Sequence, residues 1–321
     1  DTDVWLEYAG EKGIHGAILS YLSFKKENFY MVENTVDGKF FVTARGWEDL
    51  SEILKSYEEL QVEIGEELIG EFLQKEEIAR DFAGYYRLYE KYKSDYQIQE
   101  ILDGNVISGQ LKTCCDMGKK ASFEERFTVT EMLLEAVTER ISVFQKIDEK
   151  TEKLYENLKL LKIFLQEKNS VEAMEQFVAS RRKALDAKIC SELLTAEEAA
   201  REEEQIRILE EYFFQLKELH ISDVAEGIEQ IVERFGNVCR LRNEKLEETK
   251  KMLEQAFSFL EECFGEGQEL LLFETGLTGD DRCSIFISQY GCPSYFKHCE
   301  LLLYSKKENE MRKECRDLLE E

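Results

Sequence analysis

One arginine in this sequence lies where a cation is electrostatically disfavoured. An apolar run rich in aromatic and β-branched residues ends at Thr43, and a helical pattern begins directly after it. Thr43 is a predicted N-cap, because its hydroxyl can accept a hydrogen bond from the first helical turn. Arg45 falls in that turn, at the positive end of the helix dipole, where Glu48 and Asp49 are favourable. Composition alone favours a solvated surface arginine, and the functional alternative is an arginine that binds a phosphate beside the helix N-terminus.

A second group of chemically capable residues lies near the C-terminus. Cysteine and histidine are common zinc ligands, and the group comprises Cys283, Cys292, His298 and Cys299. Their spacing contains no paired Cys-x-x-Cys motif, so the sequence argues against a metal site. His15 stands alone near a predicted helix start, and we expect it to cap or pack rather than to catalyse.

Two further patterns each have a structural and a functional interpretation. Arg181, Arg182 and Lys183 form the one strong basic cluster. They could contact an anion or a partner, but nearby acidic residues favour a solvated face. A tyrosine stripe in residues 76–93 could stack on nucleic-acid bases. Its helical spacing in an acidic context predicts a core face instead.

The elements that position Arg45 follow from local patterns. Residues 29–43 carry aromatic and β-branched side chains on both sides of Asp37-Gly38, which predicts a β-hairpin. Residues 45–59 place their apolar side chains on one face, as in an amphipathic helix, and two further amphipathic helices follow.

Longer helices are predicted beyond residue 122. Capping boxes begin at Ser122 and Thr195. Apolar steps of three and four residues mark a seam at Phe144, Ile147, Thr151, Leu154, Leu158, Leu161 and Leu165. Such helices cannot each bury a seam alone, so we expect antiparallel hairpins in a bundle or stalk, with an intermolecular coiled coil as the alternative. Residues 106–120 are weakly patterned, 269–277 favour helix over strand, and 294–319 are a predicted helix.

Composition narrows the classes of function. The 321 residues carry a net charge of −26, which argues against binding to nucleic acids or anionic membranes. A hydrophobic fraction of 43% argues against wholesale disorder. Nine cysteines without regular spacing are typical of reduced thiols, so a cytoplasmic location is expected.

Part of the chain is similar to a known family. Residues 13–22, 28–30 and 41–51 resemble the C-terminal lid of bacterial MoxR-like AAA+ ATPases, and the resemblance extends over about residues 1–105. In that family a Thr/Ser-x-Arg at a lid-helix start is the sensor 2 motif, whose arginine contacts the γ-phosphate of ATP. The resemblance implies this role for Arg45 alone. It also implies ATP and Mg²⁺ bound in the full-length parent, a ring of neighbouring subunits, and a von Willebrand A-domain partner.

The chain departs from that family because it contains no Walker A loop. That loop requires Gly-x-x-x-x-Gly-Lys-Ser/Thr to hold the phosphates. The Gly-Lys pairs begin at Gly38 and Gly118, but neither has a glycine five residues earlier or a hydroxyl residue after the lysine. Together with a first residue that is not methionine, this leads us to expect a fragment that follows an absent ATPase core.

The predicted fold is mainly α, with one β-hairpin. We expect a lid-like helical domain over residues 1–105, a long-helix bundle or stalk over 106–264, and a C-terminal helical segment that packs on the stalk over 265–321. The first functional hypothesis is a lid whose sensor arginine and helical extension couple ATP hydrolysis to remodelling of a substrate. The alternative is an acidic helical scaffold without a nucleotide role. A free-standing hydrolase is weaker, because no carboxylate pair has a specific catalytic spacing.

Overall fold

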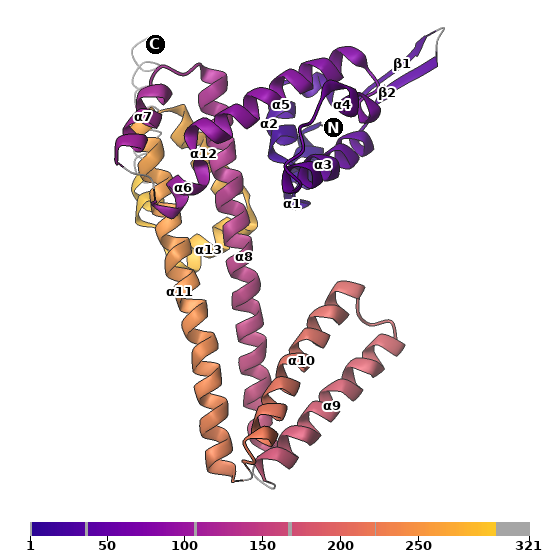
Figure 1. Ribbon diagram of the computed structural model, residues 1–321, viewed down its shortest axis with the longest axis vertical. Helices are drawn as coiled ribbons and strands as arrows, with labels where there is room; N and C mark the ends of the chain where they lie inside the picture. Colours follow the sequence, from indigo (N-terminus) through magenta and orange to yellow (C-terminus); the bar gives the residue numbers. More distant parts are fainter. Residues whose placement is uncertain (1, 36–37, 106–107, 166–168, 222, 300–321) are drawn as a thin grey trace, which may run out of the picture. The chain divides into compact units, whose positions relative to one another are not determined.

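The computed structural model describes residues 2–35, 38–105, 108–165, 169–221 and 223–299 (Figure 1). It is 83% helical, with 13 helices and one two-stranded hairpin in the described residues. The predicted mainly-α fold is confirmed. Among the described residues, no helix combines the length and the apolar character needed to cross a membrane.

The chain forms two compact units. Unit 1 comprises residues 1–139 and 251–321, and unit 2 comprises residues 140–250. Two long helices, α8 (Phe123–Phe164) and α11 (Val224–Phe264), each contribute to both units. The units therefore group the residues differently from the three predicted segments, whose boundaries stay predictions.

The N-terminal region of unit 1 (residues 2–103) packs short helices around an aromatic core. Trp47, Tyr21 and Phe82 are fully buried or nearly so, and the Trp47 and Phe82 rings meet edge to face at 5.3 Å. The elements of this region are α1 (Thr2–Glu11), α2 (Gly16–Phe24), the 3₁₀ turn η1 (Lys26–Asn28), β1 (Met31–Thr35), β2 (Gly38–Val42), α3 (Ala44–Glu59), α4 (Glu66–Phe72), α5 (Glu76–Tyr96) and α6 (Ile98–Asp103).

The predicted hairpin is present, and Figure 1 shows it projecting beyond the helices of this region. The strands are antiparallel, with Met31 opposite Val42 and Val32 opposite Phe41. Successive side chains of a strand point to opposite faces of the hairpin. Val42 is therefore buried against the core, while Val32 and Phe41 are exposed on the other face. Asp37 of the predicted turn lies outside the described residues.

The remainder of unit 1 includes a helix that the sequence pattern did not predict. Helix α7 (Ser108–Gly118) covers the weakly patterned segment, and Cys114 and Cys115 are its buried side chains. Two cysteines thus supply an apolar surface that a search for larger aliphatic residues overlooks. Helices α12 (Gln268–Gly279) and α13 (Asp281–Tyr290) follow α11, and residues 293–299 are helical. The rest of the helix predicted over 294–319 lies outside the described residues.

Unit 2 has its own hydrophobic core. Helices α9 (Ser170–Cys190) and α10 (Ala196–Glu218) form an antiparallel hairpin that packs with the adjoining parts of α8 and α11 (Figure 1). The predicted capping box at Thr195 is present, with both reciprocal bonds to Glu198. The most deeply buried members of the core include Leu154, Leu161, Ala173, Met174, Phe177, Leu209, Tyr212 and Leu216.

Candidate functional site

Arg45 occupies the first turn of α3, as predicted. The Thr43 side chain caps the helix by accepting a hydrogen bond from the Gly46 N–H at 3.2 Å. The Arg45 side chain is 80% exposed, and its Nε donates to the Asp49 carboxylate one turn later at 3.0 Å. That hydrogen bond raises the pKa of Arg45 above its ordinary value. Arg45 is therefore a permanently charged, solvent-facing guanidinium.

The backbone that carries Arg45 is anchored on both sides. Trp47 is fully buried, and its indole N–H donates to the carbonyl oxygen of Phe29 at 3.1 Å. A Cβ on Gly46 would lie 2.7 Å from the carbonyl oxygen of Phe72, so α4 approaches α3 as closely as glycine permits. The first turn of α3 is thus held in place by the core while Arg45 points to solvent.

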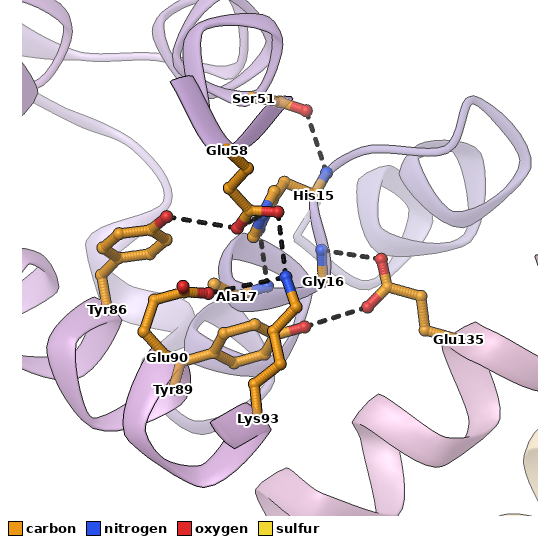
Figure 2. A network of polar contacts seen from close by, with 10 residues as sticks. All are labelled: His15, Gly16, Ala17, Ser51, Glu58, Tyr86, Tyr89, Glu90, Lys93 and Glu135. Atoms are coloured by element: carbon orange, nitrogen blue, oxygen red, sulfur yellow. Dashed lines mark hydrogen bonds and ion pairs between the residues drawn. The ribbon is translucent and has the colours of Figure 1, made fainter. Parts of the chain in front are cut away.

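A polar network lies in the same region, centred on His15 and Glu58 (Figure 2). The buried His15 ring accepts a hydrogen bond at Nδ1 from the Ala17 N–H, at 3.1 Å, and so caps α2. This leaves the proton on Nε2, which lies 2.8 Å from Glu58 Oε1 and donates to it. The Ser51 hydroxyl accepts the His15 backbone N–H at 2.9 Å. The expected capping role of His15 is confirmed.

Glu58 is held as a carboxylate by its neighbours. It accepts hydrogen bonds from the Tyr86 hydroxyl at 3.2 Å and from Lys93 Nζ at 3.0 Å. Burial alone would raise the pKa of Glu58, but the hydrogen bond from His15 and the hydrogen bond and charge of Lys93 outweigh it and lower the pKa to about 2. A carboxylate this acidic is a poor proton acceptor near neutral pH, so the network is structural rather than a general base.

An open groove of 840 Å³ borders this network. Glu58, Glu59 and Glu63 line it together with Arg87 and Lys93. Because both signs of charge are present, the lining favours no single ligand charge.

The second carboxylate of the network comes from α8. Glu135 accepts the Gly16 N–H at Oε1 and the Tyr89 hydroxyl at Oε2, each at 3.1 Å (Figure 2). Burial and the adjacent Glu135 charge raise the pKa of Tyr89. Tyr86 and Tyr89 are buried, and their hydroxyls donate hydrogen bonds to Glu58 and Glu135. The predicted core role of the tyrosine stripe is therefore confirmed.

The basic cluster of unit 2 is balanced by polar neighbours. Arg182 pairs with Glu210 at 2.8 Å, and Arg181 donates to the side-chain oxygen of Asn157. Arg182 and Lys183 are exposed. This arrangement is the solvated face that the sequence favoured.

The cysteines and histidine near the C-terminus have separate partners. Cys292 donates to Glu254 at 3.2 Å, while the His298 ring lies 2.5 Å from Glu261 and stacks on Phe257. Burial raises the pKa of both Cys283 and Cys292 to about 12, so these groups are thiols at neutral pH. No group of three or more potential ligands in the described ranges is placed to hold a metal ion.

Sequence reasoning did not identify Glu58, Lys93 or Glu135. Each binds residues far away in the chain, and Glu135 lies 119 positions from Gly16, so no local pattern points to them. No protein-family model matches the sequence, and neither the comparison with curated proteins nor that with solved structures finds a match.

Proposed function

We propose that residues 1–105 act as the nucleotide-sensing lid of a MoxR-like AAA+ ATPase, with Arg45 as its sensor arginine. The observation that carries this proposal is the exposed Arg45 guanidinium on a helix turn that the buried Trp47 anchors to the hydrophobic core. The P-loop core that binds ATP and Mg²⁺ is a separate component, because this sequence contains no Walker A loop.

The chemistry of the first turn of α3 suits a phosphate. The guanidinium presents several N–H donors in a plane, and the helix N-terminus adds a favourable partial positive charge. Arg45 pairs with the carboxylate of Asp49 in an exposed i,i+4 pair. Such pairs are weak in water, so a γ-phosphate can replace Asp49 without a large loss.

The lid would then change position with the nucleotide state. Movement of the lid would couple hydrolysis to remodelling of a substrate, with neighbouring subunits in a ring and a von Willebrand A-domain protein as partners. The helices beyond residue 105 would supply contacts to a partner or to adjacent subunits. Ile163, Val232 and Leu241 are exposed apolar side chains of unit 2 that such a partner would cover.

The test is ATP turnover by a polypeptide in which this chain follows its P-loop core. We expect Arg45→Ala to reduce turnover by about 10²-fold or more, because removing a preorganised charge that faces the transferred phosphate has effects of that size. Arg45→Lys should retain only part of the wild-type turnover, since lysine lacks the planar set of N–H donors of the guanidinium.

Arg240→Ala is the matched control. Arg240 is also exposed and pairs with a carboxylate one turn later, Glu244, but it lies inside α11 rather than at a helix start. Its replacement should leave turnover unchanged. Equal turnover in the wild type and Arg45→Ala would remove Arg45 from the mechanism.

An acidic scaffold without a nucleotide role is the second candidate. It is favoured by the net charge of −26 together with the exposed apolar residues of unit 2. The scaffold hypothesis predicts that Arg45→Ala has no effect on ATP turnover. It also predicts that substitutions at Val232 and Leu241 weaken binding to a partner.

A further inference from the structure

The start of α8 is bound to the N-terminal region by several specific contacts. The Phe24 and Phe127 rings meet at 4.4 Å. The Tyr85 hydroxyl lies 3.1 Å from the Thr128 hydroxyl, and the Tyr96 hydroxyl donates to Glu125 at 2.8 Å. These contacts span the first turns of α8, and Glu135 extends them by two more turns.

The Glu135 contact differs from the others because it is made to the end of a helix. The Glu135 carboxylate accepts the backbone N–H of Gly16, the first residue of α2, and the hydroxyl of Tyr89 on α5 (Figure 2). A carboxylate at a helix N-terminus satisfies an otherwise unpaired N–H and interacts favourably with the helix dipole. One side chain of α8 thus holds both α2 and α5.

The sequence of α2 leaves space for this carboxylate. A Cβ on Gly16 would lie 1.7 Å from Glu135 Oε2 and 2.7 Å from the Tyr89 hydroxyl oxygen. Any side chain at position 16 must therefore displace Glu135 or Tyr89. Glycine at this position is explained by the close approach of α8, since any Cβ here would meet the Glu135 carboxylate.

We propose that Glu135 is a positioning residue that makes the start of α8 part of the lid, so that residues 123–139 move with residues 2–103 as one body. The contact itself is independent of nucleotide. Its use as an output of nucleotide sensing rests on the function proposed above.

A double-mutant cycle on the chain itself tests the contact. Hydrogen exchange is measured for wild type, Glu135→Ala, Gly16→Ala and the double variant, with Glu139→Ala as the control on the same helix. Glu139 is exposed one turn beyond Glu135. We expect Glu135→Ala and Gly16→Ala each to raise exchange about tenfold in the first turn of α2 and in residues 123–139, because each removes the hydrogen bond that Glu135 accepts from the Gly16 N–H.

The two substitutions should not add. With Glu135 removed, Gly16→Ala no longer displaces a carboxylate, and only the Tyr89 hydroxyl remains close to the new Cβ, so the double variant should lose less protection than the sum of the two single variants. Glu135→Gln should retain most of the protection, because its amide oxygen can still accept the Gly16 N–H. Additive effects, or an effect of Glu135→Ala confined to α8, would overturn the proposal.

A second readout separates positioning from simple stabilisation. When the chain is joined to its core, exchange in residues 123–139 should differ between the ATP and ADP states of the wild type. Glu135→Ala should reduce this difference most in the turns around residue 135, beyond the contacts of Phe127 and Thr128, while leaving turnover unchanged. If turnover is insensitive to Arg45→Ala, the nucleotide proposal fails even though the cycle holds. If the effects of Glu135→Ala and Gly16→Ala are additive while Arg45→Ala abolishes turnover, the proposed role of Glu135 is wrong and the nucleotide proposal stands.

Discussion

At the scale of single residues, two glutamates have different tasks in one network. Glu58 of α3 collects three hydrogen-bond donors from two other elements, since His15 caps α2 and both Tyr86 and Lys93 lie on α5. Glu135 joins α8 to α2 and α5. Both carboxylates hold helices together through the hydrogen bonds that they accept.

The low pKa of Glu58 predicts a specific acid sensitivity. Its folded-state pKa is about 2, below the ordinary value of 4.5. A depressed pKa means that the stabilisation is complete above about pH 4.5 and is lost as the pH falls from 4.5 toward 2. We expect this loss to be on the order of 1–3 kcal/mol, because one pKa unit corresponds to about 1.4 kcal/mol and Glu58 is partly solvated.

Denaturant unfolding at several pH values measures this dependence. Glu58→Gln should be less stable than wild type at pH 7, and the two stabilities should converge as the pH falls below 4.5. Glu59→Gln is the control, because Glu59 is an exposed neighbour. A constant difference between wild type and Glu58→Gln across this range would show that ionisation of Glu58 does not contribute.

At the scale of elements, the caps decide where the helices begin. Thr43 is extended, with φ −141° and ψ 161°, and its hydroxyl fixes the turn that carries Arg45. Asn169 caps α9 and Thr195 caps α10 in the same way. The start of α3 thus depends on one hydroxyl as well as on the burial of Trp47.

Removing the Thr43 cap should therefore loosen α3 at its start. Thr43→Ala is expected to lower the free energy of unfolding by about 1 kcal/mol, and Thr43→Ser should restore most of it because serine keeps the acceptor. Thermal unfolding of the three proteins provides the measurement. If serine and alanine are equally destabilising, the lost methyl contact rather than the hydrogen bond is responsible.

These elements also show which features a sequence can reveal. The hairpin and the caps at Thr43 and Thr195 were predicted because their signals lie within a few neighbouring residues. Helix α7 was missed because cysteines form its buried face. The Gly16–Glu135 contact was missed because only the tertiary fold brings these residues together.

At the scale of the whole molecule, the chain combines two units with separate cores. Unit 1 contains the anchored turn of α3 and the Glu135 contact, while unit 2 contains the α9–α10 hairpin. The overall charge of −26 would repel free nucleotides in solution. The proposed recognition of ATP by Arg45 would therefore require a P-loop core that holds the phosphates in place.

The most direct test of the central claim is the discrimination between ATP and ADP by the chain joined to its P-loop core. Binding of ADP and of a non-hydrolysable ATP analogue is measured by calorimetry for wild type, Arg45→Ala and Arg240→Ala. We predict that Arg45→Ala weakens binding of the ATP analogue by about tenfold or more and leaves the affinity for ADP unchanged. A hydrogen bond to a charged group contributes about 1.5–3 kcal/mol, which corresponds to such a change in affinity. Arg240→Ala should match wild type for both ligands. An unchanged ratio of the two affinities in Arg45→Ala would contradict the assignment of Arg45 as a γ-phosphate sensor.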